Sequence, residues 1–378
     1  MRIGINFHTF DRYISGVEYY TLGMINALLC FDRLNEYVIF TNAPEIIEQY
    51  VSCRAGLVIR KIGGIRSRTQ RILWEHFQLP RLAKQEGLDV LHCPSYICPV
   101  ITNHIPYVVT VHDTIAIDHP RWCKPSNALY FNLAMRASLQ KAARIIAVSK
   151  CTAEDIKRNF SLNAGKIRMI YPGIDPIFNA ERDPARQEHV RIRYNLPQRY
   201  LLFVGNLEPK KNIPALLSAL HLLQKGDLFR RLVIVGHRRW GPKSQLKTIL
   251  QKIGEKAIVF TGYVARDDLP AVYHMSDVVL FPSLYEGFGF PALEAMACGV
   301  PVIASSRGAL AETAADAAFV IDPESPGQIA NAISQMLTNK KLREKHVQLG
   351  YQQSGRFGWE KTAAQLLKVY NEVVDTYE

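Results

Sequence analysis

Short apolar runs rich in β-branched residues recur along the whole chain, and most are separated by stretches long enough to form a helix. This alternation is typical of βαβ units, in which parallel strands are joined by helical crossovers. The runs occupy residues 3–7, 37–40, 58–59, 90–92, 107–111, 145–148 and 167–171, and then 201–204, 232–235, 258–260, 278–281, 302–304 and 319–321. The sequence therefore predicts an α/β protein with two doubly wound parallel sheets.

The two series are separated by residues 173–197, where prolines, charges and an arginine-rich stretch replace the alternation. A chain of 378 residues is also longer than a single hydrophobic core usually supports. We expect an N-terminal domain over residues 1–175, a C-terminal domain over residues 176–358, and a last amphipathic helix over residues 359–378 that packs back on the N-terminal domain. Because ligands of open parallel sheets bind beyond the carboxyl ends of the strands, we expect the two sheets to face a cleft.

The composition excludes several classes of protein. Hydrophobic residues make up 48% of the chain and charged residues 21%, which is the balance of a packed protein rather than a disordered one. The 7 cysteines and 11 histidines form no CxxC pair and no zinc-ligand spacing, so no metal site is expected. We expect a cytoplasmic protein with reduced thiols, because the cysteines are scattered and no signal-peptide pattern follows Met1. The sequence also has no apolar run long enough to span a bilayer.

A formal net charge of +12 predicts an anionic partner. Nucleic acid is disfavoured because the chain has no zinc finger and no RNA-recognition signature, which leaves phosphorylated substrates and an anionic membrane surface. Residues 66–84 carry Arg66, Arg68, Arg71, Arg81 and Lys84 together with Trp74 and Phe77. This segment is either a basic surface that contacts anionic lipid, on the cytoplasmic membrane face, or an ordinary helix, and for Trp74 and Phe77 we favour a helix that buries both side chains.

The most informative stretch lies between residues 281 and 294. Gly287 and Gly289 follow an apolar run and lead into a helix, where free backbone amides and the helix dipole bind phosphate. Glu286 and Glu294 flank these glycines, and each carboxylate can accept two hydroxyl groups of a sugar. The alternative is a glycine-rich turn with two solvated glutamates, which the apolar Phe288 disfavours.

The order of these residues resembles a known family. Glu286, the glycine loop and Glu294 are similar to the E-x7-E signature of retaining glycosyltransferases of the GT-B fold, especially family GT4. Further pieces resemble that family in the same order along nearly the whole chain: Gly16, His112-Asp113, Ser149, residues 172–175, Lys210-Lys211 and Gly262-Tyr263. The resemblance implies two Rossmann-like domains, with the acceptor bound mainly by the first and a nucleotide sugar mainly by the second. It also implies retention of the anomeric configuration and catalysis without a metal.

Two adjacent cations stand where a second helix is expected to begin. Lys210 and Lys211 are unfavourable at the positive end of a helix dipole unless an anion compensates them, and a leaving diphosphate would do so. The resemblance gives Lys211 the family's catalytic lysine position, with Gly205 and Asn206 also at the donor. Many family members carry arginine where Asn206 stands, so we expect Lys210 to supply the second positive charge.

The N-terminal domain offers fewer candidates. His112 ends an apolar run, where a lone histidine is more often structural; the resemblance instead places it beside the donor sugar, with Asp113 fixing its tautomer or helping to place the acceptor. Gly16 would let the backbone approach the diphosphate closely, although Ser15 replaces the first of the family's two glycines. Ser149 either donates to a phosphate or caps the following helix.

The resemblance leads to a specific functional hypothesis. Residues 205–212 are similar to those of mannosyltransferases, which predicts transfer of mannose from GDP-mannose to a glycan or lipid-linked saccharide in polysaccharide biosynthesis. Glu286 and His112 would position the sugar, Glu294 would bind the ribose, and the backbone at Gly262 and Tyr263 would contact the base unless it forms a plain turn. A UDP-hexose-dependent GT4 transferase, a GT-B sugar-nucleotide epimerase and a catalytically silent nucleotide-sugar-binding protein remain as alternatives. A nicotinamide dehydrogenase is disfavoured because no GxGxxG follows the first run.

Overall fold

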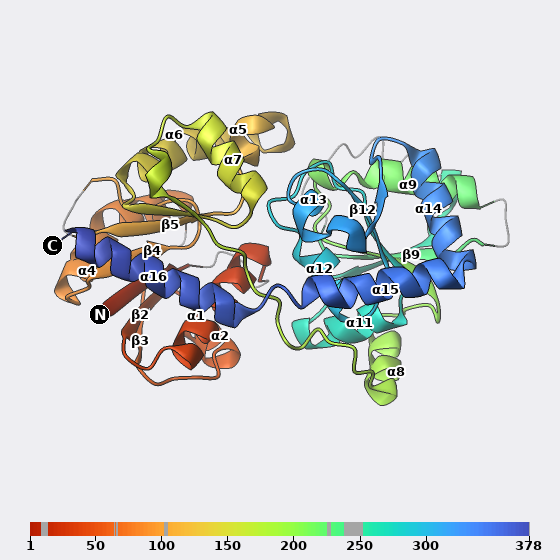
Figure 1. Ribbon diagram of the computed structural model, residues 1–378, viewed down its shortest axis with the longest axis horizontal. Coiled ribbons are helices and arrows are strands. Elements are labelled where there is room, and N and C mark those ends of the chain that lie inside the picture. Colours follow the sequence, from red (N-terminus) through yellow and green to blue (C-terminus); the bar gives the residue numbers. More distant parts are fainter. Residues whose placement is uncertain are drawn as a thin grey trace. The chain divides into compact units, whose positions relative to one another are not determined.

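The computed structural model describes residues 1–8, 14–63, 65, 67–101, 105–224, 228–237 and 252–377. Contacts divide the chain into two compact units, one of Met1–Gly173 with Gly358–Glu378 and the other of Ile174–Phe357. Each unit is built on a parallel sheet with helices packed against it (Figure 1). None of the described helices combines the length and apolar character needed to cross a bilayer.

The sheet of the first unit has the strand order β3-β2-β1-β4-β5-β6-β7, and all of its pairs are parallel. Its strands are β1 (Arg2–Phe7), β2 (Glu36–Thr41), β3 (Leu57–Lys61), β4 (Val90–Cys93), β5 (Tyr107–Val111), β6 (Arg144–Ala147) and β7 (Ile167–Met169). The central strands β4 and β5 are buried along their whole length. Burial on both faces is why these strands appear in the sequence as continuous apolar runs rather than alternating ones.

The last helix of the chain belongs to this first unit. Helix α16 lies along α1 (Figure 1), and its first residue, Trp359, packs so closely on Gly23 that an added Cβ would lie 2.3 Å from the indole ring. A glycine is therefore needed at this point of α1. The helices of the unit are α1 (Gly16–Phe31), α2 (Pro44–Tyr50), α3 (Arg68–Leu73), the π-helix η1 (Trp74–Gln78), α4 (Leu79–Gln85), α5 (Ile115–Asp118), η2 (Pro120–Trp122), α6 (Pro125–Lys141), α7 (Lys150–Asn159), η3 (Ala164–Lys166) and α16 (Trp359–Tyr377).

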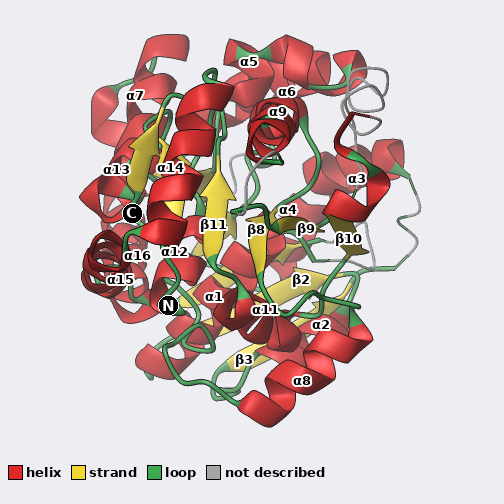
Figure 2. Cartoon of the chain, turned by 90° about the vertical axis from the view of Figure 1, so that its right-hand side faces the viewer, coloured by secondary structure: helices red, strands yellow, loops and turns green. Residues whose placement is uncertain are grey.

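The second unit repeats the architecture with the strand order β10-β9-β8-β11-β12-β13, again parallel, and Figure 2 shows β11, β8, β9 and β10 side by side. Its strands are β8 (Tyr200–Val204), β9 (Arg231–Val235), β10 (Ile258–Gly262), β11 (Val278–Phe281), β12 (Val302–Ser305) and β13 (Phe319–Ile321). Its helices are α8 (Pro184–Arg193), η4 (Pro209–Lys211), α9 (Ile213–Leu223), η5 (Glu255–Ala257), η6 (Arg266–Asp268), α11 (Leu269–Met275), α12 (Phe290–Ala297), α13 (Leu310–Thr313), η7 (Ala315–Ala317), α14 (Pro326–Thr338) and α15 (Lys340–Ser354). The prediction of two doubly wound parallel sheets is confirmed.

Two expectations about the first unit are wrong. Cys30 and Cys53 form a disulfide, with Cα atoms 5.3 Å apart, although all cysteines were expected to be reduced. They lie 23 residues apart, and only the packing of α1 near the segment after α2 brings them together. In the basic segment, Trp74 is 3% exposed but Phe77 is 47% exposed, so only one of the two aromatics is buried.

The exposure of Phe77 follows from the local backbone. Residues Trp74–Gln78 form one turn of π-helix, which changes the helical register so that Phe77 does not follow Trp74 onto the buried face. Among the basic residues predicted there, Arg71 donates to Glu75 at 2.6 Å, Arg66 lies outside the described residues, and the side chain of Arg68 is not described.

Candidate functional site

A buried ion pair lies at the carboxyl ends of β8 and β11, the two central strands of the second sheet. Lys211, from the turn after β8, donates through Nζ to Oε1 of Glu286, from the loop after β11, at 2.6 Å. Burial opposes ionisation of Glu286, but the charges of Lys211 and Lys210 outweigh it and hold its pKa below the ordinary value. Glu286 is therefore ionised at neutral pH, and Nζ of Lys211 also lies 5.0 Å from the ring centroid of Phe281.

The glycine loop leads into α12, as predicted. Gly289 is the residue before the helix and has φ +93°, and a Cβ there would lie 2.7 Å from Leu310 Cδ2, so the backbone and the packing both require glycine. Phe288 is buried, and its carbonyl accepts from Thr313 Oγ1 at 2.8 Å. The loop carrying Gly287 is thus fixed where it enters the N-terminus of α12, the end at which the helix dipole favours an anion.

Another glycine, Gly308, which sequence reasoning missed, supports this loop from the segment after β12. A Cβ on Gly308 would lie 2.6 Å from the carbonyl oxygen of Glu286, and the next amide, of Ala309, donates to that oxygen at 2.8 Å. Gly308 has φ +61°, so its backbone also favours glycine. Because Gly308 stands in no motif, only the packing of the two loops reveals its part in fixing Glu286.

Glu294 is buried one turn into α12. Tyr273 donates its hydroxyl to Oε2 at 2.9 Å, and Nη1 of Arg266 lies 3.8 Å from Oε1. Arg266 in turn donates through Nε to Asp175 at 3.0 Å. Burial raises the pKa of Glu294, and Arg266 and Tyr273 offset this only in part. Sequence reasoning found Glu294 but missed Tyr273, whose position in α11 looks like an ordinary core residue.

The loops after β8, β9 and β10 lie beyond the same edge of the sheet. Asn206, which follows Gly205 at the end of β8, accepts from the amide of His237 at 3.2 Å and so links the loops after β8 and β9. Gly262 has φ +71° and open space around its Cα. Tyr263 stacks on His237 with ring centroids 6.1 Å apart and planes at 8°. His237 was missed because it stands in no motif, although it follows an apolar run.

In the first unit, His112 follows β5 and is 9% exposed. Its Nε2 lies 2.8 Å from the carbonyl oxygen of Pro94, which can only accept, so Nε2 carries the proton. Burial lowers the pKa of His112, and the Pro94 hydrogen bond and Asp113 oppose this without cancelling it. The Pro94 carbonyl, rather than Asp113, fixes the tautomer; Asp113 accepts from the amide of Ile115 at 3.3 Å.

The other two candidates of the first unit lie at helix starts. Gly16 is the first residue of α1, has nothing within 4 Å of an added Cβ, and follows Ser15, which forms a capping box with Glu18. Ser149 is fully buried and caps α7, accepting from the amide of Thr152 at 3.0 Å. The structure thus shows the capping contact of Ser149, and the phosphate contact stays a prediction.

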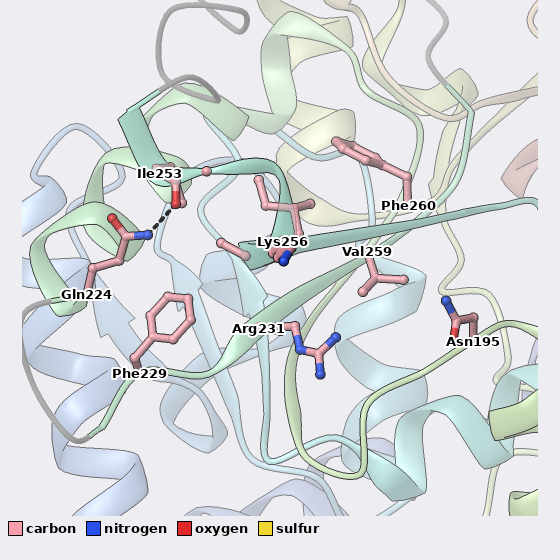
Figure 3. A pocket seen from close by; sticks show the side chains of 11 residues that line it. Asn195, Gln224, Phe229, Arg231, Ile253, Lys256, Val259 and Phe260 are labelled. Carbon is pink, nitrogen blue, oxygen red and sulfur yellow. Dashed lines mark hydrogen bonds between the residues drawn. The ribbon is translucent and has the colours of Figure 1, made fainter.

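A hollow of about 770 Å³ lies elsewhere in the second unit (Figure 3). Its lining includes Arg231 and Ile258, the first residues of β9 and β10, so it opens at the amino ends of these strands. Gln224 donates to the carbonyl of Ile253 at its rim. None of the residues predicted to bind the donor lines it, and parallel sheets bind their ligands at the opposite edge.

No group of three or more histidine, cysteine or carboxylate side chains in the described part of the chain is placed to hold a metal ion. Most of the residues predicted for the donor lie in the loops beyond one edge of the second sheet or in α12, whereas Gly16 and Ser149, also predicted for the donor, lie in the first unit with His112 and Asp113.

Comparisons with known proteins cover both units. Residues 185–353 match the family model described as Glycosyl transferases group 1, and residues 14–178 match Glycosyltransferase Family 4. The O-antigen chain mannosyltransferase B of Escherichia coli is 30% identical over 370 residues, which cover 94% of this chain and 96% of that protein. The serotype-specific mannosyltransferase WbdA of Escherichia coli is 28% identical over 281 residues, which cover 72% of this chain and 34% of that protein.

Solved structures show the same fold. The Anabaena protein HepE, solved in complex with UDP and glucose, superposes with a TM-score of 0.75 at 19% identity, over 98% of this chain and 99% of that one. Together with the two parallel sheets, this likeness confirms the predicted GT-B fold class.

Proposed function

The chain belongs to glycosyltransferase family 4, and we propose that it moves mannose from GDP-mannose onto a glycan or lipid-linked saccharide, with retention of configuration and without a metal. The choice of mannose is supported by two relatives named as mannosyltransferases. The name of one of these relatives includes the O-antigen chain, which supports a growing polysaccharide as the acceptor.

The observation that carries the proposal is the buried Lys211–Glu286 pair, whose glutamate lies on the loop that leads into α12. Departure of the sugar leaves negative charge on the diphosphate, and a buried ammonium group with a helix N-terminus stabilises such charge without a metal. Glu286 holds the Lys211 side chain in place before the donor binds. In this account Lys210 supplies the second positive charge, which Asn206 cannot.

The remaining roles follow from hydrogen-bonding capacity. Glu294 accepts the ribose hydroxyls, because Tyr273 leaves carboxylate lone pairs available. Glu286 and His112 bind hydroxyls of the transferred sugar. The backbone at Gly262 and Tyr263 contacts the base, with the ring of His237 beside it.

We further propose a cytoplasmic protein in peripheral contact with an anionic membrane, where a lipid-linked acceptor would be presented. The net charge of +12 favours such a surface, and exposed Phe77 and Leu73 lie in the predicted basic segment. Vesicles with and without anionic lipid test this: binding to neutral vesicles alone, or to none, contradicts it.

A panel of GDP- and UDP-sugars tests the donor. Thermal shift and released nucleoside diphosphate should single out GDP-mannose, and turnover should survive EDTA. Turnover of a UDP-hexose alone would replace mannose with another hexose, and conversion of the sugar nucleotide without any acceptor would favour an epimerase. Restoration of EDTA-inhibited turnover by magnesium or manganese would contradict metal independence.

A further inference from the structure

The ring of His112 is enclosed by two aromatic side chains. Tyr20 of α1 meets it edge to face, with centroids 4.8 Å apart and planes at 84°, and Tyr96 meets it at 5.4 Å and 64°. Thr152 Oγ1 donates a hydrogen bond to the backbone carbonyl oxygen of His112 at 3.2 Å, so the backbone at His112 is also held. With Nε2 bound to Pro94, the ring has little freedom to rotate or flip.

Tyr96 is held in an unfavourable backbone conformation at this point. Its φ is +69°, in the left-handed region that bulky side chains rarely adopt. Such strain persists only where the surroundings enforce it, and it is often found at functional sites. Here its amide donates to the carbonyl of Thr110 at 2.9 Å, and the conformation places the aromatic ring against His112.

Tyr20 is in turn anchored by a buried chain of hydrogen bonds. Its hydroxyl lies 3.3 Å from Thr110 Oγ1, which lies 2.7 Å from Nε2 of His92. Nδ1 of His92 lies 2.7 Å from the hydroxyl of Tyr370 in α16. The side chains of Tyr20, Thr110, His92 and Tyr370 are all fully buried. Buried polar groups at these distances make one rigid, fully paired network.

Neither histidine adds a charge to this network. Burial and the neighbouring His112 lower the pKa of His92 to about 3, so its ring is neutral and offers one donor and one acceptor to the two hydroxyls. In the neutral ring of His112, the proton lies on Nε2, so Nδ1 keeps its lone pair and can only accept a hydrogen bond.

We propose that Tyr20, Tyr96 and the chain Thr110–His92–Tyr370 are positioning residues that fix His112 as a hydrogen-bond acceptor, through Nδ1, for a hydroxyl group of the sugar. The identity of the substrate in this inference rests on the proposed function, whereas the tautomer of His112 does not. It assigns the last helix a part in catalysis, because α16 supplies Tyr370 and also Trp359, whose ring lies 5.9 Å from that of Tyr20.

The first experiment removes single hydroxyl groups. Tyr20→Phe and Tyr370→Phe keep both rings in place, and Tyr377→Phe, in the same helix but 51% exposed, is the matched control. With GDP-mannose as donor, methyl mannoside as acceptor and released GDP as the readout, we expect kcat to fall about tenfold in the first two variants, with donor KM nearly unchanged. The control should match the wild type. Wild-type kcat in both buried variants would overturn the positioning role.

The second experiment needs no turnover. In protein labelled with ¹⁵N-histidine, long-range ¹⁵N–¹H spectra at neutral pH, assigned with His112→Gln and His92→Gln, should show His112 neutral and protonated on Nε2. A proton on Nδ1, or a charged ring, would overturn the inference. If the wild type transfers no mannose, the proposed function fails, whereas the tautomer measurement still decides whether Nδ1 of His112 can act as the acceptor.

Discussion

Replacing Lys211 by methionine should affect folding and turnover through the same buried carboxylate. The change leaves Glu286 charged among buried groups, since the side chains of Lys211 and Glu286 are only 11% and 7% exposed. Removing one partner of such a pair costs roughly 3–5 kcal/mol of unfolding free energy. A hydrogen bond to a charged group contributes roughly 1.5–3 kcal/mol. Losing the bond between Lys211 and the leaving diphosphate should therefore slow turnover by about tenfold to 150-fold.

The cost in stability should depend on pH in a defined direction. In the wild type the folded-state pKa of Glu286 lies below its ordinary value, so the pair stabilises the fold above the unfolded-state pKa. That contribution is lost as the pH falls through the lowered folded-state pKa. The difference in unfolding free energy between wild type and Lys211→Met should therefore be largest at neutral pH and shrink in acid.

Urea unfolding from neutral to acidic pH, with steady-state kinetics, measures both effects. Adding Glu286→Gln to Lys211→Met should recover much of the stability, because no charge stays buried, but none of the turnover. Lys340→Met is the control, since Lys340 is 79% exposed and lies 3.8 Å from Glu344. Normal kcat in Lys211→Met, or a destabilisation as small as that of Lys340→Met, would refute the reasoning.

Three further predictions concern other residues. Glu294→Gln should raise donor KM by about tenfold or more with little change in kcat, and Tyr273→Phe should do the same more weakly; an equal fall in kcat would contradict the ribose role. Because burial raises the pKa of Glu294, wild-type donor KM should rise on acidification before kcat falls, and Glu294→Gln should lack this rise. Cys30→Ser should lower the unfolding free energy by about 2–4 kcal/mol under oxidising conditions and change nothing in excess reductant.

The sequence predicted the sheets well because their central strands are buried on both faces. Every predicted run became a strand, although β6 ends at Ala147 and β7 at Met169, slightly before the predicted ends. A continuous apolar run is visible in the sequence itself, whereas the last residue of the strand depends on how far the neighbouring strand continues to pair with it.

The site was predictable only where a motif carried it. Glu286 and Lys211 were each found from local patterns, but their pairing across 75 residues needs the neighbouring positions of β8 and β11. Tyr273 contacts Glu294 and Tyr96 contacts His112, and each partner is distant in sequence. The residues that flank the two tyrosines form no motif that predicts these contacts. The hydroxyl of Ser149 fitted both a cap and a phosphate, and the cap is seen because α7 starts at the next residue.

The most direct test of the proposed reaction is the configuration of its product. GDP-mannose labelled with ¹³C at the anomeric carbon, incubated with a mannose-terminated acceptor in EDTA, should give a linkage with the donor's anomeric configuration, read from the one-bond carbon–proton coupling by NMR. An inverted linkage would contradict the retaining mechanism. Absence of product in EDTA, together with its return on addition of magnesium or manganese, would contradict the assignment of the leaving-group charge to Lys211, Lys210 and the amides of α12.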